Sequence, residues 1–500
     1  MQKNNYSNFS LGYWQTVTFS IFLLFLIVVP FSDIEIVTFD PLIELTLMAK
    51  GLISPDFFAT EYLLQAIVQT VNFAIIGVFL GVVVGAPFAL IYQHPVVSSC
   101  CSFLRAIHEI FWALLFLQIF GLSAITGILA IAIPFAATFA RVFNDIITQS
   151  SDDALISMDS QVDRISRFSY GKIAQVMPEL MSYTRYRFEC ALRSSAILGF
   201  VGMPTLGFYL ETAFRQGNYS EGAALLIIFI TMIGTIRYWC PSKLIILYLA
   251  IACFTLPEIP AINGQLIVNF ISKDILPPAF VNVEHLSSVP WSSFYSWFID
   301  IITEQALPGL LSTVTLAILA LAATLLMTLI AHTFASRHLW CRPITWLGQF
   351  SLLIGRSMPE YILAFIFLIL FGPSMLPAII ALAIHNGCII AYLSVKQSEQ
   401  FSAQQLPMSK FDQFNYHIIP NIYPNMMVLL FYHFEIIVRE TAVFGMLGIM
   451  TLGFYIDSNF SEIRYSNALV LIVFTALINV LIDKISRAVL QQPQTTYASC

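Results

Sequence analysis

Long apolar runs separated by shorter polar stretches dominate the chain. A helix that crosses the hydrocarbon core of a bilayer needs about 20 mostly apolar residues. The runs that meet this requirement predict an all-α integral membrane protein with about twelve spans. The expected spans are 13–31, 62–91, 104–122, 125–143, 179–203 and 222–240 in the first half, and 243–257, 305–333, 353–372, 375–395, 425–449 and 466–486 in the second half.

The loops between these runs predict the orientation of the chain. Of the loop lysines and arginines, 13 fall on the side that holds both termini and 4 on the other side. Cytoplasmic loops are enriched in these residues, so both termini are expected in the cytoplasm. The segments 36–60 and 258–303 are too polar to span, and we expect them on the outer surface as short amphipathic pieces. The first run, Trp14–Phe31, lacks a small-residue cleavage site and is expected to be a retained helix.

An internal repeat organises the chain. Residues 186–209 match residues 432–455 at 12 of 24 positions, and residues 105–133 match residues 356–384 at 12 of 29. Each copy has an even number of predicted spans, so both enter the membrane in the same direction. The sequence therefore predicts two parallel-oriented six-helix repeats, with domains at 1–240 and 241–490 and a cytoplasmic tail at 491–500.

Composition agrees with a membrane protein and excludes several other classes. The chain is 58% hydrophobic and 10% charged, with a mean hydropathy of +0.81, whereas soluble domains carry about 25% charged residues. A net charge of −6 without a basic block argues against nucleic acid as a partner. Eight cysteines form no CxxC pair, and no P-loop, HExxH or GxSxG occurs. No metal, cofactor or enzymatic activity of the chain itself is expected.

Charged residues recur inside the repeated apolar runs. Glu189 and Arg193 correspond to Glu435 and Arg439, four residues apart in each copy, so each pair can lie on one helix face. One interpretation is a structural ion pair at a helix interface. The other is that the two arginines face each other across the repeat axis as a transient anion site, because a guanidinium can donate two hydrogen bonds to an oxyanion.

A second charged pair has the same spacing near the cytoplasmic end of the third span. Arg105 and Glu109 correspond to Arg356 and Glu360. The arginines are expected to reach the interface while the glutamates sit deeper and line the inner mouth of a path. His108 has no histidine counterpart, and a packed or hydrogen-bonded role is favoured over a ligand role.

Glycines and two polar loops complete the candidate features. Gly199 and Gly202, with Gly445 and Gly448, allow either close helix packing or a broken helix at an outer gate. The loops 144–178 and 396–424 occupy matching places in the two copies. They are longer than the usual connections of about 2–8 residues, which favours a docking surface for a soluble partner over plain connectors.

The runs at 105–116 (RAIHEIFWALLF) and 176–189 (VMPELMSYTRYRFE), followed by Arg193 and the glycines, resemble phosphonate-type ABC importer permeases. That family has a type I importer fold and normally carries one unit of about six spans per chain, so this chain resembles two units fused. The resemblance implies a bacterial inner-membrane location and transport of phosphonate, phosphite or phosphate. It also implies a periplasmic solute-binding protein and two cytoplasmic ATPase subunits that dock on the loop before the fifth span.

The chain departs from the family pattern in these loops. The position of the family's loop glycine falls near Gln161 and near Pro407, and its Leu-Pro ending becomes Ile173-Ala174 and Ile419-Pro420. The glycine run after the charged pair is also altered, which leaves the oxyanion open. The candidate ATPase-coupling residues are Gln161, Arg164, Arg167, Pro407, Lys410 and Pro420.

The sequence thus predicts the permease of an ATP-driven importer for a phosphorus oxyanion, which works by alternating access. A secondary transporter with two six-helix halves is one alternative. Another is a membrane enzyme or scaffold that kept the permease fold and lost coupling to an ATPase. Membrane lipid is an expected partner in every case. The candidate path or gate residues are Glu109, Glu360, Glu189, Arg193, Glu435, Arg439, Gly199, Gly202, Gly445 and Gly448.

Overall fold

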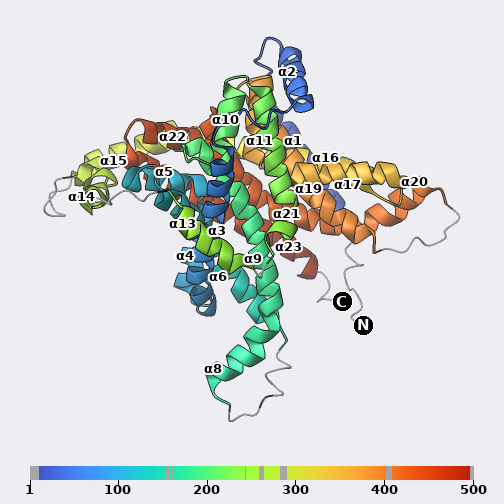
Figure 1. The fold of residues 1–500 in the computed structure, drawn as a ribbon, viewed down its shortest axis with the longest axis horizontal. Coiled ribbons are helices and arrows are strands. Elements are labelled where there is room, and N and C mark those ends of the chain that lie inside the picture. Colours follow the sequence, from blue (N-terminus) through green and yellow to red (C-terminus); the bar gives the residue numbers. More distant parts are fainter. Residues whose placement is uncertain are drawn as a thin grey trace. The chain divides into compact units, whose positions relative to one another are not determined.

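The computed structural model describes residues 11–151, 158, 162–241, 244–257, 264–281, 290–400 and 408–495. These residues form helices and connecting turns, with no strand among them (Figure 1). The all-α fold expected from the sequence is therefore confirmed. Packing divides the chain into two compact units, one formed by Lys50–Lys273 and the other by Met1–Ala49 with Asp274–Cys500.

The unit at 50–273 is built on two long helices, α3 (Leu63–Leu90) and α6 (Ala124–Gln149). Gly77 and Gly85 of α3 let the two helices approach closely. A Cβ atom at Gly77 would lie 2.8 Å from Ile131 Cγ2, and one at Gly85 would lie 2.5 Å from the carbonyl oxygen of Ala136. The other elements are α4 (Pro95–Ala106), α5 (Glu109–Phe120), α8 (Arg164–Ser166), η3 (Arg167–Ile173), α9 (Ala174–Ile197), η4 (Leu198–Val201), α10 (Leu206–Arg215), α11 (Tyr219–Gly234), α12 (Ile236–Trp239), α13 (Ile245–Thr255), α14 (Gly264–Asn269) and η6 (Phe270–Asp274).

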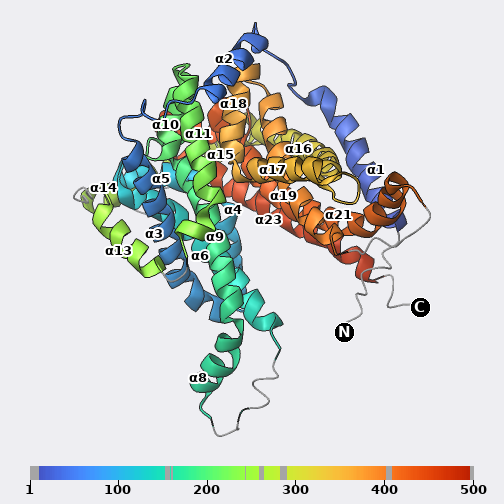
Figure 2. The ribbon, with the colours of Figure 1, turned by 45° about the vertical axis from the view of Figure 1, so that its right-hand side comes forward.

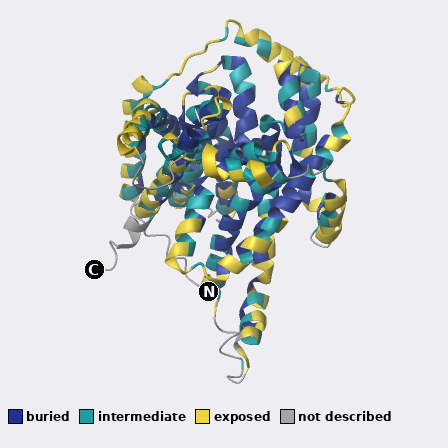
Figure 3. Cartoon of the chain, turned by 90° about the vertical axis from the view of Figure 1, so that its left-hand side faces the viewer, coloured by how far each residue is buried: buried dark blue, intermediate teal, exposed yellow. Residues whose placement is uncertain are grey.

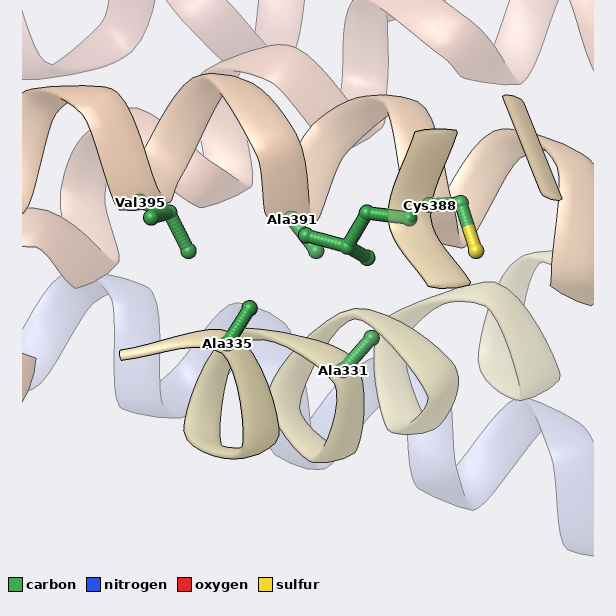
Figure 4. Packing of buried hydrophobic residues seen from close by; sticks show 6 residues of the cluster. Ala331, Ala335, Cys388, Ala391 and Val395 are labelled. Carbon is green, nitrogen blue, oxygen red and sulfur yellow. The ribbon is translucent and has the colours of Figure 1, made fainter. Parts of the chain in front are cut away.

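The other unit is built in the same way on α16 (Leu307–Ala335) and α19 (Met375–Ser398). Small side chains line their contact: Ala331 and Ala335 of α16 pack against Cys388, Ala391 and Val395 of α19 (Figure 4). Its other elements are α1 (Leu11–Val28), η2 (Val29–Phe31), α2 (Pro41–Ile53, which crosses the boundary between the units), η7 (Pro278–Phe280), α15 (Trp291–Asp300), η9 (Ile301–Ala306), α17 (Arg342–Ser357), α18 (Glu360–Phe371), α20 (Lys410–Gln413), η10 (Phe414–Ile418), α21 (Ile419–Val443), η11 (Phe444–Leu447), α22 (Leu452–Ser461) and α23 (Tyr465–Thr495).

The N-terminal helix α1 packs with the second half of the chain, against α16 and α21. The Tyr13 hydroxyl donates to the carbonyl oxygen of Val489 at 2.9 Å, and Thr18 hydrogen-bonds to the Tyr423 hydroxyl. Helix α1 thus belongs to the compact unit that contains the repeated stretches 356–384 and 432–455. The repeat boundaries at 1–240 and 241–490 rest on sequence similarity rather than on packing, and they stay a prediction.

Six helices in the described part of the chain are long and apolar enough to cross a membrane, and four bent helix pairs raise the number of candidate spans to ten. Many described residues are exposed (Figure 3). A large number of them carry large apolar side chains, as lipid contact requires. The expected count of twelve is not confirmed. The helices at two expected spans, 222–240 and 243–257, are shorter: Tyr219–Gly234 has 16 residues and Ile245–Thr255 has 11.

Two expected spans, 104–122 and 353–372, are bent rather than straight. Helices α4 and α5 meet at 87°, and α17 and α18 meet at 95°. The breaks fall at Ile107–His108 and Met358–Pro359, where the backbone is extended. Pro359 has no N–H for a helical hydrogen bond, and the His108 ring caps the next helix, so each site starts a new helix instead of continuing the old one.

The end of the segment 258–303, which was expected to form separate surface pieces, is continuous with a long helix. Residues 291–335 form one continuous helical candidate span, so α15 runs directly into the long membrane helix. The position of residues 291–303 on the outer surface stays a prediction. Helix α15 itself has no buried residue.

Corresponding stretches of the two halves fold into the same succession of elements. Helix α5 begins 251 residues before α18, η4 begins 246 residues before η11, and α10 begins 246 residues before α22. The same glycines take the same left-handed conformation, with φ of 95° at Gly202 and 89° at Gly448. The sequence offsets of 251 and 246 thus hold for local structure as well as for residue identity.

Candidate functional site

The charged pairs that were expected along a path lie on α9 and α21. Glu189, Arg193, Glu435 and Arg439 are all half-buried. Arg193 Nη2 donates a hydrogen bond to Cys190 Sγ at 3.4 Å. The four residues therefore occupy membrane helices and are partly accessible, and their role as a structural pair or as an anion site stays a prediction.

The expected face-sharing of Arg105 with Glu109, and of Arg356 with Glu360, is wrong. Each arginine lies in the last turn of one helix and each glutamate begins the next, and the two helices meet at about a right angle. The i,i+4 geometry exists only within a continuous helix. Arg356 instead lies with its Cζ 4.2 Å from the centroid of the Tyr392 ring, a cation–π contact.

Histidines accompany both glutamates at the helix breaks. His108 is buried and its Nδ1 accepts from the backbone N–H of Ile110 at 3.2 Å, which confirms the packed role favoured for it. His385 Nδ1 donates to the carbonyl oxygen of Met358 at 2.7 Å, while its Nε2 lies 3.5 Å from Glu360 Oε2. The break frees the Met358 carbonyl from helical bonding, and the histidine satisfies it.

The glycines combine the two roles that the sequence left open. A Cβ atom at Gly199 would lie 2.1 Å from the Phe208 nitrogen, and one at Gly445 would lie 1.9 Å from the Phe454 nitrogen, so both positions require close packing. Gly202 and Gly448 end their helices in the left-handed conformation, which favours glycine. The chain bends there by 51° in one half and 44° in the other.

A threonine fixes the helix after each break. Thr70 Oγ1 accepts from the backbone N–H of Leu206 at 2.9 Å, and Thr313 Oγ1 accepts from that of Leu452 at 3.0 Å. Each threonine also donates to the carbonyl oxygen four residues earlier. The first N–H of α10 and of α22 is thereby anchored to α3 or α16, at equivalent positions in the two halves.

A buried polar chain in the second half was missed by the sequence reasoning. Asn386 Oδ1 accepts from His433 Nδ1 at 2.8 Å, and Asn386 Nδ2 donates to Glu440 Oε2 at 3.3 Å. All three side chains are less than 9% exposed. Polar residues inside apolar runs are a usable signal, but only residues shared by both copies stand out as a repeat, and these three are not shared.

The corresponding positions of the first half hold a different contact, which was also missed. Arg187 corresponds to His433, and Phe135 corresponds to Asn386. Arg187 Cζ lies 5.4 Å from the Phe135 ring centroid and 5.5 Å from that of Tyr183, and its Nε donates to the Tyr183 hydroxyl at 2.7 Å. The same two positions therefore touch in both halves, through different chemistry.

The coupling-loop residues are only partly described. Gln161 and Pro407 lie outside the described residues, as does the side chain of Arg164. Arg167 begins η3 and is half-buried, Lys410 begins α20 and is exposed, and Pro420 lies in the first turn of α21. Figure 2 shows α8 at the far end of the helical stretch that leads into α9.

The loops have the same local structure in both halves. A capping side chain starts each: Asp163 Oδ2 accepts from the N–H groups of Ile165 and Ser166 at 3.1 Å each, and Ser409 Oγ accepts from the N–H of Asp412 at 3.1 Å. Hydrogen bonds from the Ser166 side chain and then from its backbone lower the pKa of Asp163. A short α-helical turn and a π-helical turn follow in each case.

Exposed apolar side chains occupy equivalent places on these turns. Ile165 is 78% exposed and Tyr170 is 74% exposed, and their counterparts Phe411 and Tyr416 are 63% and 75% exposed. Polar and proline positions of the loops were predicted from the sequence as coupling residues, whereas these four residues were not. The offset of 246, applied through the loops, would have paired them.

Curated permeases resemble this chain over most of its length. The phosphate-import permease protein PhnE of Mycolicibacterium smegmatis is 23% identical over 440 residues, covering 81% of each chain. The chain is thus similar to a phosphate-import permease. The resemblance to this permease family that the sequence motifs suggested is confirmed.

Two further relatives cover parts of the chain. The phosphite transport system permease protein PtxC of Stutzerimonas stutzeri is 24% identical over 45% of this chain and 87% of its own. A putative cryptic phosphonate transport system permease protein of Escherichia coli K12 is 33% identical over 15% of this chain and 62% of its own. No protein-family model and no solved structure matches the chain.

These relatives are transport permeases, which are not enzymes themselves, and they support a permease role for the chain. Together with the apolar helices they indicate a multi-pass protein of the inner membrane. Within the described residues, no cluster of three or more His, Cys, Asp or Glu side chains is arranged to hold a metal ion.

Proposed function

We propose that the chain is the transmembrane permease of an ATP-driven importer that carries phosphonate, phosphite or phosphate by alternating access. The observation that carries the proposal is the similarity to a phosphate-import permease over 81% of both chains. Phosphite and phosphonate permeases among the shorter relatives support the same class of substrate. The periplasmic solute-binding protein of such an importer would deliver the oxyanion to the outer face.

Both permease units are proposed to lie in this one chain, in parallel orientation and with both termini in the cytoplasm. The phosphite permease aligns 87% of its length with only 45% of this chain, as expected if one unit of this chain corresponds to one whole subunit there. The shared order of elements and the matching threonine hydrogen bonds support the same arrangement. Parallel repeats of this kind are a known architecture of transporters.

The two cytoplasmic ATPases are proposed to dock on the segments 162–173 and 408–419. Each segment presents a large apolar residue and, five positions later, a tyrosine, all of them exposed. Exposed apolar side chains outside the membrane favour contact with a partner. Arg167 and Lys410 lie in the same two segments, and Pro420 lies in the first turn of α21, the helix that would transmit the movement of the ATPase. Gln161, Arg164 and Pro407 stay candidates by their sequence positions alone.

The path and gate are proposed to involve the charged and glycine positions of α9, α21 and the helix breaks. Glu109, Glu360, Glu189, Arg193, Glu435 and Arg439 supply charge inside the membrane region, where charge is costly and generally functional. Gly199, Gly202, Gly445 and Gly448 form the bends that would open and close the outer end.

The direct test is uptake into proteoliposomes that contain the permease, its ATPase and its binding protein. We expect radiolabelled phosphate, phosphite or a phosphonate to accumulate only with ATP inside the compartment that holds the ATPase. Accumulation driven by an ion gradient without ATP would favour a secondary transporter. If the chain neither co-purifies with an ATPase nor supports any uptake, the result would favour a membrane scaffold that has lost coupling to an ATPase.

The proposed docking of the ATPase subunits is tested with the double variant Ile165→Asp and Phe411→Asp. Placing a carboxylate on each apolar contact should remove ATPase from the purified complex and abolish ATP-dependent uptake, because a buried unpaired charge at an interface is strongly unfavourable. The matched control is Arg337→Asp with Arg464→Asp, which changes charge at two other exposed positions. Equal ATPase recovery from both double variants would contradict the docking surface.

The anion role of the arginines is tested with Arg193→Ala combined with Arg439→Ala in the reconstituted importer. Loss of both guanidinium groups should lower uptake and substrate-stimulated ATPase by about tenfold or more, the effect of removing roughly one charged hydrogen bond. Normal uptake and normal stimulation would leave the arginines a structural role only.

A further inference from the structure

Arg187 of α9 lies close to two aromatic rings. The Cζ atom of its guanidinium lies 5.4 Å from the Phe135 centroid and 5.5 Å from the Tyr183 centroid. Arg187 Nε donates a hydrogen bond to the Tyr183 hydroxyl at 2.7 Å. The two rings and the hydroxyl group together restrict the orientation of the guanidinium.

The charge of Arg187 has no carboxylate partner within the described part of the chain. Of its five N–H donors, the one on Nε is used, and the four on Nη1 and Nη2 make no hydrogen bond to a described residue. The side chain is only half-buried. A cation in a membrane helix with unsatisfied, partly accessible donors is costly unless it meets an anion during function.

The remaining donors match one class of ligand. The two terminal nitrogens of a guanidinium form a planar fork that can hold two oxygens of a phosphonate, phosphite or phosphate at once. Because Nε is bonded to Tyr183, Nη1 and Nη2 are the nitrogen atoms that remain for a ligand.

The second half does not repeat this arrangement. His433 stands at the position of Arg187, and its Nδ1 is occupied by Asn386, which also binds the Glu440 carboxylate. A carboxylate next to this position weakens attraction for an anion. The donor fork therefore exists in the first half only.

We propose that Arg187 is a substrate-contacting residue of the importer, whose Nη1 and Nη2 bind two oxygens of the phosphorus oxyanion during its passage. This inference rests on the proposed function for its substrate class. Arg187 is not one of the repeated charged residues, so it is an additional candidate for substrate binding. The proposed contact with the oxyanion lies in the first half of the chain only. Tyr183 and Phe135 are positioning residues for the guanidinium.

Two variants and one matched control test the contact in proteoliposomes. Arg187→Gln should lower ATP-dependent phosphate or phosphite uptake by about a hundredfold, and Arg187→Lys by about tenfold, since lysine keeps the charge but loses the two-pronged contact. Basal ATPase activity and thermal unfolding should stay close to wild type. Arg185→Gln is the control: it removes a charge two residues earlier, from an exposed side chain that lines a separate apolar cavity of about 170 Å³.

A binding measurement on the permease alone gives an independent readout. Inorganic phosphate added to the purified permease in detergent should show a broadened ³¹P resonance with wild type and with Arg185→Gln, and a sharp resonance with Arg187→Gln. Uptake by Arg187→Gln within twofold of wild type, or unchanged broadening, would overturn the proposal. If Arg187→Gln does not assemble, wild-type uptake by Arg187→Lys overturns it instead.

Failure of the proposed function is distinguishable from failure of this inference. A wild-type complex that imports no phosphorus oxyanion refutes the importer. Wild-type import that Arg187→Gln leaves intact refutes only the role of Arg187. The resonance measurement needs neither ATPase nor binding protein, so it tests Arg187 in both cases.

Discussion

Gly199 and Gly445 are equivalent positions at which the chain passes very close to itself. A methyl group at either position would lie about 2 Å from a backbone nitrogen of the following helix, at 2.1 Å for Gly199 and 1.9 Å for Gly445. Backbone cannot yield as a flexible side chain does. We therefore expect Gly199→Ala and Gly445→Ala each to destabilise the protein by about 1–3 kcal/mol or more, the usual cost of overpacking.

The measurement is the thermal midpoint of the purified protein in detergent. The control is Gly234→Ala, because a Cβ atom at Gly234 meets nothing within 4 Å and its backbone is helical. Equal midpoints for the three variants would contradict the tight packing at Gly199 and Gly445.

Single residues were predictable when both copies share them. Glu189, Arg193 and the glycines stood out because they recur, and the structure places the charged pair in α9 and the glycines at the break that follows it. Arg187, Asn386 and Glu440 were missed because each occurs in one copy only. A contact that uses different chemistry in each half, such as Arg187 with Phe135 and His433 with Asn386, leaves no repeat in the sequence.

At the scale of elements, hydropathy located the long helices and misjudged where they bend. The runs 104–122 and 353–372 are apolar enough to span, yet each is split at nearly a right angle. Pro359 was a visible signal for a break, whereas the break at His108 depends on a side-chain cap that composition does not reveal. The short helices α11 and α13 likewise fall below the length that their apolar runs suggested.

The break at Pro359 leads to a prediction about His385. Its Nδ1 satisfies the Met358 carbonyl that the break leaves open, at 2.7 Å, and the ring is buried. We expect His385→Leu to destabilise the protein by about 1–3 kcal/mol, the cost of an unsatisfied buried acceptor. His385→Asn should recover part of this loss, because the Asn Nδ2 donor stands near the place of the His Nδ1 donor.

A second buried histidine supplies the control. His332 is fully buried, and neither of its ring nitrogens has a hydrogen-bond partner among the described residues. His332→Leu should therefore be neutral or stabilising, since it removes polar atoms that gain nothing in the fold. Thermal midpoints of the three variants give the comparison, and equal losses at both histidines would show that packing alone determines their effect.

At the scale of the whole molecule, the duplication was the most informative feature of the sequence. It predicted that distant segments share one local structure, and the matching elements, caps and threonine hydrogen bonds agree with it. The packing of α1 could not be predicted in this way, because α1 precedes the repeated blocks and its contacts with α16 and α21 leave no periodic pattern. Long-range packing of a single helix depends on surfaces that form only after the bundle folds.

The duplication also predicts the composition of the working complex. A relative that aligns 87% of its length with 45% of this chain supplies one unit per chain, whereas this chain would supply two. We therefore expect one copy of this 56.1 kDa chain to bind two ATPase subunits. Native mass spectrometry of the purified complex should give a 1:2 ratio of permease to ATPase. A 2:2 complex would mean that each chain contributes only one functional unit, because a second chain would then be needed to complete the path.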